Sequence, residues 1–388
     1  MKLRAAVLFL FASGLYAQNA QNSENAQKAT DGTKAMHAMR AACPANGCSM
    51  TLEAKTYVVN SGTFDIAGSS TTHAANASLI GAGKATQIVC SPSTVTEACV
   101  RVYNGALSTI QDLAVRCNSN VTYCVEYIST GSAEDGNMRN VAVSGGQYGI
   151  AISPTQHWDI SHINMYDVSM RKAAVADLVV GDGVQSNVLD NKCFGCTFDT
   201  SGGDGILIRG GGFSCYGCDW DENTGIDVHV TTPPDQTLML HGGRSEGSAA
   251  FYFFSIGGGT GMIPGTSIDG ISWFAGKQAA KYAITHVYAA SISITNSRFA
   301  SIYNAVNFNL GSNNPNSPTP VYMSNVGVSN ANWSSVLAGM LAQPMMLYSV
   351  NDYYFNPAND RLGKGSGQIW SSSSLSTPSG TGPQRPPR

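Results

Sequence analysis

Three carboxylates recur at one position of an internal repeat. The segments NKCFGCTFD (191–199) and FSCYGCDWD (213–221) carry two cysteines and a final aspartate 22 residues apart, and LMLHGGRSE (238–246) continues the pattern with a glutamate in the place of the aspartate. If each repeat stacks on the next, Asp199, Asp221 and Glu246 form one acidic column with about 5 Å between neighbours.

The acidic column is suited to glycoside hydrolysis. That reaction needs one protonated carboxyl to donate to the leaving oxygen and one ionised carboxylate to activate water or attack the sugar. We therefore predict a catalytic site with Asp199 or Asp221 as the base and Glu246 as the acid. The predicted substrate-binding residues beside it are Arg244, His241, Asp219, Glu222 and Asp204.

A structural interpretation competes with this one. Aspartate is common at turns because its carboxylate caps nearby amides, and the column falls where each strand should end. Stacked carboxylates repel one another and raise one another's pKa unless a ligand binds between them. Turn formation alone does not explain this repulsion, and for that reason a functional role is considered.

A lyase is the second enzymatic hypothesis. It would need a base beside a uronate carboxylate, with Ca²⁺ or another cation to neutralise that group. His241, close to Arg244 and Glu246, is the candidate base, although its alignment with Phe194 and Tyr216 also fits a stacked structural histidine. Apart from Ca²⁺ in a lyase, no cofactor and no metal ligand is predicted.

The remaining histidines and the aromatic residues are assigned to structure. His157 and His286 are isolated in the sequence and are expected at surface or turn positions. Eight aromatic side chains could stack on sugars, but most fall on the inward phase of their strands and are expected in the core: Trp158, Tyr166, Tyr216, Trp220, Phe251, Tyr252, Phe253 and Trp273.

Four of the ten cysteines form two Cys-x-x-Cys pairs, at 193/196 and 215/218, whose spacing matches a zinc ribbon. The repeat instead places each cysteine above its counterpart, at a separation that a disulfide can bridge. Inter-coil disulfides or a thiol stack are therefore expected, with bonds within each pair and zinc as alternatives. The other pairs should close local loops: Cys43/Cys48, Cys90/Cys99 and Cys117/Cys124.

The elements that position these residues are predicted from the repeat. Alternating segments return at IQDLAVRC (110–117), MRNVAV (138–143) and ISITNSRF (292–299), most of them followed by a second short strand. Such coils cannot bury an apolar face alone and must stack. We predict an all-β, single-stranded right-handed parallel β-helix over 31–363, with a capping helix at 31–42; a β-sandwich is the distant alternative. The Gly-rich stretch 255–290 is expected to interrupt the coils as an insertion.

The ends and the composition indicate an exported chain. Residues 1–17 have the pattern of a signal peptide, 18–30 of a flexible segment and 364–388 of a disordered Ser/Gly/Pro-rich tail. The net charge is −3 with no basic stripe, which argues against nucleic acid and anionic membranes, and no later stretch predicts membrane insertion. A secreted, periplasmic or extracellular location is expected.

The N-terminal segments carry a family resemblance. DGTKAMHAMRAAC (31–43), LEAKTYVV (52–59) and ASLIGAGKATQIVC (77–90) resemble the opening of pectate-lyase-superfamily, rhamnogalacturonase/epimerase-like β-helix domains, and with the coils the resemblance covers roughly 31–330. Gly32 interrupts the usual acidic-Thr pair, and Glu53-Ala54-Lys55 replaces the usual Pro-Ala-Gly.

The resemblance implies a partner that is a polysaccharide or oligosaccharide, and a hydrolase, a lyase or a non-catalytic adhesin-like protein. Tail-spike-like members imply a trimer as one oligomeric form. The Gly-His-Gly and Arg-Ile-Lys motifs usual in polygalacturonase-like hydrolases do not occur in this sequence.

Overall fold

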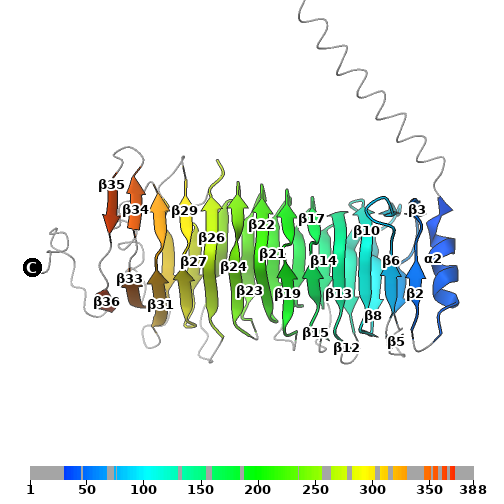
Figure 1. Cartoon of the computed structure of the whole chain (residues 1–388), viewed down its shortest axis with the longest axis horizontal. Coiled ribbons are helices and arrows are strands. Elements are labelled where there is room, and N and C mark those ends of the chain that lie inside the picture. Colours follow the sequence, from blue (N-terminus) through cyan, green and yellow to red (C-terminus); the bar gives the residue numbers. More distant parts are fainter. Residues whose placement is uncertain are drawn as a thin grey trace, which may run out of the picture.

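The described chain is a long ladder of short strands with a helix at one end (Figure 1). A computed structural model describes residues 30–44, 47–67, 74–75, 77–129, 133–153, 160–183, 188–234, 236–255, 264–277, 282–301, 306–312, 318–329, 345–350, 353–356, 361–364 and 368–371. Within these ranges we find no helix with the length and apolar character needed to cross a bilayer. The predicted signal peptide, residues 18–29 of the predicted flexible segment 18–30, and His157 and Trp158 lie outside the described residues, whereas Thr30 begins β1.

Each coil contributes to two parallel sheets. Within the described ranges, sheet B has ten strands in stacking order: β4 (Phe64–Ala67), β8 (Thr96–Tyr103), β11 (Val121–Ile128), β14 (Tyr148–Ile152), β18 (Ala176–Val180), β21 (Asp204–Arg209), β23 (Ile226–Thr232), β25 (Ala250–Ser255), β27 (Ile284–Val287) and β30 (Phe308–Gly311).

Sheet A is the larger sheet, with 22 strands in the described part of the chain: β1 (Thr30–Asp31), β2 (Ser49–Thr51), β3 (Thr56–Val59), β6 (Ser78–Ile80), β7 (Gln87–Cys90), β10 (Thr109–Cys117), β13 (Asn137–Gly145), β16 (Asn164–Tyr166), β17 (Ser169–Arg171), β19 (Asn191–Phe194), β20 (Thr197–Asp199), β22 (Phe213–Asp221), β24 (Leu238–Glu246), β26 (Thr266–Phe274), β28 (Ile292–Thr295), β29 (Arg298–Ala300), β31 (Thr319–Ser324), β32 (Gly327–Ser329), β33 (Met345–Val350), β34 (Tyr353–Asn356), β35 (Arg361–Lys364) and β36 (Gln368–Ser371). Two short pairs complete the described strands: β5 (Ala74–Ala75) with β9 (Gly105–Ala106), and β12 (Ala133–Glu134) with β15 (Ile160–Ser161).

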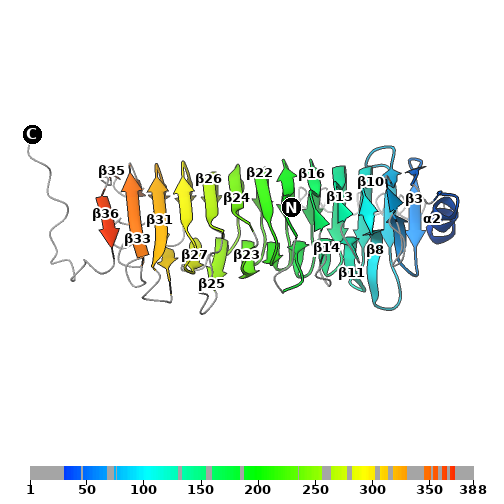
Figure 2. The ribbon, with the colours of Figure 1, turned by 90° about the horizontal axis from the view of Figure 1, so that it is seen from below.

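The register confirms the repeat. Cys193 pairs with Cys215, and Cys215 with Leu240. Asp199 pairs with Asp221, and Asp221 with Glu246. The strands β22, β24 and β26 lie side by side in sequence order in both views (Figure 2). The predicted parallel β-helix is confirmed.

The capping helix is also confirmed. Helix α2 (Gly32–Ala41) packs on β3 and β4, with Met36 fully buried and Met39 partly buried against the core. A Cβ on Gly32 would lie 2.8 Å from the carbonyl carbon of Tyr57. Glycine at this position therefore lets the start of the helix approach the first coil closely.

A column of left-handed residues bends every sheet A strand from β10 to β31. Its members stack in register with φ between 49° and 67°: Asp112, Asn140, Asp167, Gly195, Gly217, Gly242, Gly270, Asn296 and Asn325. Only glycine, asparagine and aspartate occur there, and these are the residue types that adopt this backbone region most readily. Asn140 Nδ2 donates to Asp112 Oδ1 at 2.7 Å, so part of the column is also a side-chain ladder.

The interior is a continuous apolar core built from stacked positions. Phe198 lies over Trp220 with ring centroids 5.8 Å apart, and Trp220 contacts Phe251 edge-on at 5.5 Å. The predicted inward positions of Trp220, Phe251, Tyr252 and Trp273 are confirmed. Tyr166, Tyr216 and Phe253 are only partly buried and lie at alternate, outward positions, so their prediction as core is wrong.

Two further expectations are corrected. Residues 266–274 form β26, in register with β24, so the described part of 255–290 continues the coils; Ile268, Ile271 and Trp273 take the inward positions that cysteines and Trp220 fill earlier. His286 is fully buried rather than at a surface turn. Its Nε2 donates to the carbonyl of Ala290 at 2.9 Å, and burial lowers its pKa to about 4.

Local disulfides form as predicted. Cys43–Cys48, Cys90–Cys99 and Cys117–Cys124 are bonded, with Cα separations of 5.4, 5.9 and 5.9 Å.

At the far end, β36 pairs antiparallel with β33 and β35 with β34, so short strands occur on both sides of the predicted domain end at residue 363. Residues 372–388 lie outside the described part.

The bend column predicts a selective cost for replacing Gly217. A Cβ there meets nothing within 4 Å, so only its φ of 62° opposes substitution. Gly217→Ala should lower the free energy of unfolding by about 1–2 kcal/mol. Gly217→Asn should cost less, because asparagine tolerates this conformation. Equal losses in denaturant unfolding of the two variants would contradict this explanation of the column.

Candidate functional site

The three predicted catalytic carboxylates lie at the ends of adjacent sheet A strands. Asp199 ends β20, Asp221 ends β22 and Glu246 ends β24, and they occupy one register position. The next residues, Thr200, Glu222 and Gly247, are left-handed with φ of 55°, 51° and 87°. These turns lead the chain toward sheet B. The acidic column therefore lies along the edge where sheet A ends.

The column has a defined electrostatic centre at Asp221. This side chain is half-buried, whereas Glu246 is 56% exposed. Burial raises the pKa of Asp221, and the charges of Asp199, Glu222 and Glu246 raise it further, while Arg244 opposes them. A carboxyl with a raised pKa beside other carboxylates is the arrangement that acid–base catalysis uses.

Cations and an aromatic ring flank the acids. Arg244 Nη1 lies 3.5 Å from Glu246 Oε2 and is in register with Asp219, which is exposed. The column itself continues to Arg171 on one side and to Phe274 on the other. Phe274 is 38% exposed. The sequence analysis did not name Arg171 and Phe274, although the register that aligns Asp199 with Asp221 also aligns these two residues with the column.

Asp204 lies beyond the turn, at the start of β21, and has structural partners. Its Oδ1 accepts the N–H of Ile226 at 2.9 Å, and its Oδ2 lies 2.7 Å from His229 Nδ1. The Asp204 side chain is 17% exposed. The structure brings it to the next coil's backbone rather than into the acidic column, so of the predicted substrate contacts it has the clearest structural role.

His241 lies on the other side of the bend from Glu246. It stands edge-on to Tyr216 at 5.7 Å and its Nε2 is 3.2 Å from Ser267 Oγ. Tyr216, Phe194 and Tyr166 continue from it as an outward ladder of stacked rings, with Arg139 over the last ring at 4.9 Å. The stacked alternative for His241 is therefore supported by its contacts.

A buried polar network supports the turn after Asp221. Asp227 is fully buried and accepts from Ser248 Oγ at 2.7 Å, from Asn223 Nδ2 at 3.1 Å and from the hydroxyl of Ser245. Asn223 also accepts the N–H of Ser201 at 3.1 Å and donates to the carbonyl of Phe198 at 3.2 Å. The network joins the coils that carry the acids. Ser201, Asn223 and Ser248 each lie two residues after an acid of the column, so they follow the same repeat, and sequence reasoning missed this polar column.

Asp177 is a second buried carboxyl, two coils before Asp227 in sheet B. It accepts the backbone N–H of Ala173 at 3.3 Å. Burial raises its pKa to about 8, so the protonated form is favoured near neutral pH.

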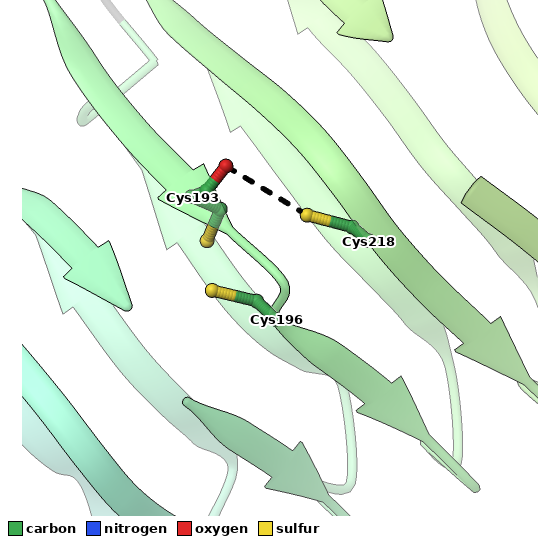
Figure 3. Close-up of side chains that lie close together, drawn as sticks. All are labelled: Cys193, Cys196 and Cys218. Atoms are coloured by element: carbon green, nitrogen blue, oxygen red, sulfur yellow. Dashed lines mark hydrogen bonds between the residues drawn. The ribbon is translucent and has the colours of Figure 1, made fainter. Parts of the chain in front are cut away.

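The ligand atoms that come close enough for a metal ion belong to cysteines. Over the described residues, Cys193, Cys196 and Cys218 bring their Sγ atoms within 4.8 Å of one another (Figure 3). Together with Cys215 they are buried and unbonded.

Comparisons with known proteins identify the fold. No family model and no curated protein matches the chain. Among solved structures, the Agl-KA catalytic domain is 13% identical, with a TM-score of 0.50, and the match covers 79% of this chain and 58% of that one. A tailspike of Acinetobacter phage vb_AbaP_AS12, gp42, is 10% identical, with a TM-score of 0.48 and coverages of 85% and 62%.

A third similar structure is the catalytic domain of a GH87 α-1,3-glucanase in complex with tetrasaccharides, which is 14% identical, with a TM-score of 0.39 and coverages of 74% and 55%. The chain thus spans less than two thirds of each of these structures. The likeness to the Agl-KA domain confirms, at the level of the fold, the expected resemblance to pectin-lyase-like β-helix proteins.

The buried network predicts a pH dependence of stability. Burial raises the pKa of Asp227 to about 7, above the value of about 4 for an unfolded chain. The folded protein then retains a proton that the unfolded chain releases, so its contribution to stability is complete below about pH 4 and is lost as the pH rises to about 7.

Asp227→Asn should flatten this decrease, by roughly 1 to 4 kcal/mol over the interval. It should also lower stability at pH 4 by about 1 kcal/mol, because an amide has one acceptor oxygen and cannot accept both from Asn223 and from the hydroxyls of Ser245 and Ser248. Denaturant unfolding of both proteins between pH 4 and 7.5 measures the difference, and parallel curves would contradict the assignment to Asp227.

Proposed function

We propose that the chain is a glycoside hydrolase that cleaves a polysaccharide at the acidic column. The observation that carries the proposal is the raised pKa of Asp221 between two carboxylates in register with it. Turns alone would explain single aspartates, but they do not require like charges on three consecutive coils. The pectin-lyase-like fold supports the proposal, since it presents long faces of stacked coils to extended polymers.

Asp221 is the proposed proton donor, in place of Glu246. Burial and the neighbouring carboxylates raise its pKa, and it lies at the centre of the column. Asp199, one coil away, is the proposed base or nucleophile. Adjacent coils place backbone positions about 5 Å apart and alternate coils about 10 Å apart. Direct attack by Asp199 would retain the anomeric configuration, whereas a water activated by a more distant carboxylate would invert it. The anomer formed first therefore reports which acid assists Asp221.

The charge of the site favours a neutral glycan. Asp199, Asp221, Glu222 and Glu246 would repel the carboxylates of a polyuronide, whereas they can accept hydrogen bonds from sugar hydroxyls. Arg244 and Asp219 lie in register beside the column and are the proposed hydroxyl contacts. Phe274 offers an exposed apolar ring at the end of the column for a sugar face. Three disulfides support a location outside the cytoplasm.

Glycan binding without cleavage is the second candidate. The outward ladder of Tyr166, Phe194 and Tyr216 favours it, because these half-buried rings present a continuous apolar strip across three coils. The lyase hypothesis is weaker, since the ring of His241 is engaged by Tyr216 and Ser267.

The test is release of reducing ends from neutral and uronic glycans by the purified chain, with and without Ca²⁺. Asp221→Asn and Asp199→Asn should each lower the rate at least about 100-fold, because each removes a proton-transfer or nucleophilic group. Arg244→Ala should mainly raise KM. The control is Asp167→Asn, at a bend position where other coils carry asparagine, and it should keep full activity.

Three outcomes would contradict the proposal. Full activity in Asp221→Asn would place the chemistry elsewhere. Products with an unsaturated sugar would identify a lyase. Retention of the chain on an immobilised glycan, with no reducing ends released from any polymer, would support the binding protein.

A further inference from the structure

Four cysteine side chains from neighbouring coils meet inside the β-helix. Cys193 and Cys196 flank the bend at Gly195, and Cys215 and Cys218 flank the bend at Gly217 in the next coil. All four are at most 1% exposed. The proposed hydrolase does not use them, and nothing in its chemistry accounts for four thiols at one point of an otherwise apolar core.

Three of the sulfur atoms lie close together. The Sγ atoms of Cys193, Cys196 and Cys218 lie within 4.8 Å of one another (Figure 3), and Cys215 is in register with Cys193 on the next coil. A tetrahedral zinc centre with bonds of about 2.3 Å places its sulfur atoms about 3.8 Å apart. Small side-chain rotations would close the described cluster onto such an ion.

Two of the thiols donate to backbone carbonyls. Cys196 Sγ donates to the carbonyl of Met165 at 3.7 Å, and Cys218 Sγ donates to the carbonyl of Cys193 at 3.9 Å. Zinc binding would replace these weak hydrogen bonds with Zn–S bonds, and a dication would neutralise half of the charge of four thiolates.

The spacing agrees with this geometry. The two Cys-x-x-Cys pairs have the separation seen in four-cysteine zinc sites, and the bends at Gly195 and Gly217 allow both cysteines of each pair to point to the same side. The other six cysteines form disulfides with near neighbours, whereas these four remain free in the structure.

We propose that Cys193, Cys196, Cys215 and Cys218 together bind one zinc ion as a closed, structural tetrathiolate centre. Binding forms four Zn–S bonds and releases the protons of the thiols to solvent. The ion would fasten the two coils whose strands end in Asp199 and Asp221. The inference is independent of the proposed hydrolase activity, and it replaces the sequence-based expectation of no metal ligand.

The first test is the metal content of the full chain, exported and purified without chelator. We expect one zinc per chain by elemental analysis. Denaturation without reductant should expose four reactive thiols when a chelator is present. Absence of zinc would overturn the proposal. If the zinc-free chain shows no reactive thiols, the four cysteines form disulfides. If it shows four reactive thiols, they form a thiol stack.

Variants locate the ion. Cys218→Ser should lose the zinc, whereas the double variant Cys43→Ser, Cys48→Ser, which removes a disulfide at the first coil, should keep it. A chelator should lower the Tm of the native chain and leave that of Cys218→Ser unchanged.

A measurement on the native chain avoids dependence on the folding of a variant. Exchange of zinc for Co²⁺ should produce thiolate-to-cobalt charge transfer and the visible bands of tetrahedral cobalt. A cobalt-loaded chain without these bands, or zinc retained in Cys218→Ser, would overturn the site.

Discussion

The in-register stacking of parallel coils is the constraint on which the rest of the structure depends. The parallel strands of successive coils hydrogen-bond to one another in register, so a residue type repeated in the sequence becomes a column in space. A coil exposes its apolar face unless neighbours cover it, and this makes the register a condition of stability. Columns of like residues are the direct consequence.

The stacking of like residues stabilises some columns and destabilises others. Apolar and aromatic columns, such as Phe198 over Trp220, add contact area at each step. The bend column tolerates only residues that adopt left-handed backbone. A column of carboxylates raises its own electrostatic energy, and at Asp221 this is visible as a raised pKa. The chain nevertheless carries a carboxylate at this position on three consecutive coils, and this repetition distinguishes the acidic column from the surrounding turns.

The support of the acidic column comes from inside the helix. Asp177 accepts the backbone N–H of Ala173, and the network of Asn223, Asp227 and Ser248 joins the coils that carry the acids. The low dielectric of an apolar core strengthens such hydrogen bonds. Such a network holds the turns in one conformation, and it fixes the spacing of the side chains that end the strands.

The sequence by itself determined the fold and the columns, because a 22-residue offset and alternation specify which residues stack and which face inward. It placed Asp199, Asp221, Glu246 and Arg244 correctly relative to one another. Only the tertiary structure decided what a repeat cannot encode. Bends turn His241 away from Glu246, buried hydrogen bonds of Asp227 and Asn223 join the coils that carry the acids, and β26 continues the coils with residues unlike the template. It also brought three cysteine sulfur atoms within 4.8 Å of one another, because that depends on the direction of side chains at two bends and not only on their spacing along the chain.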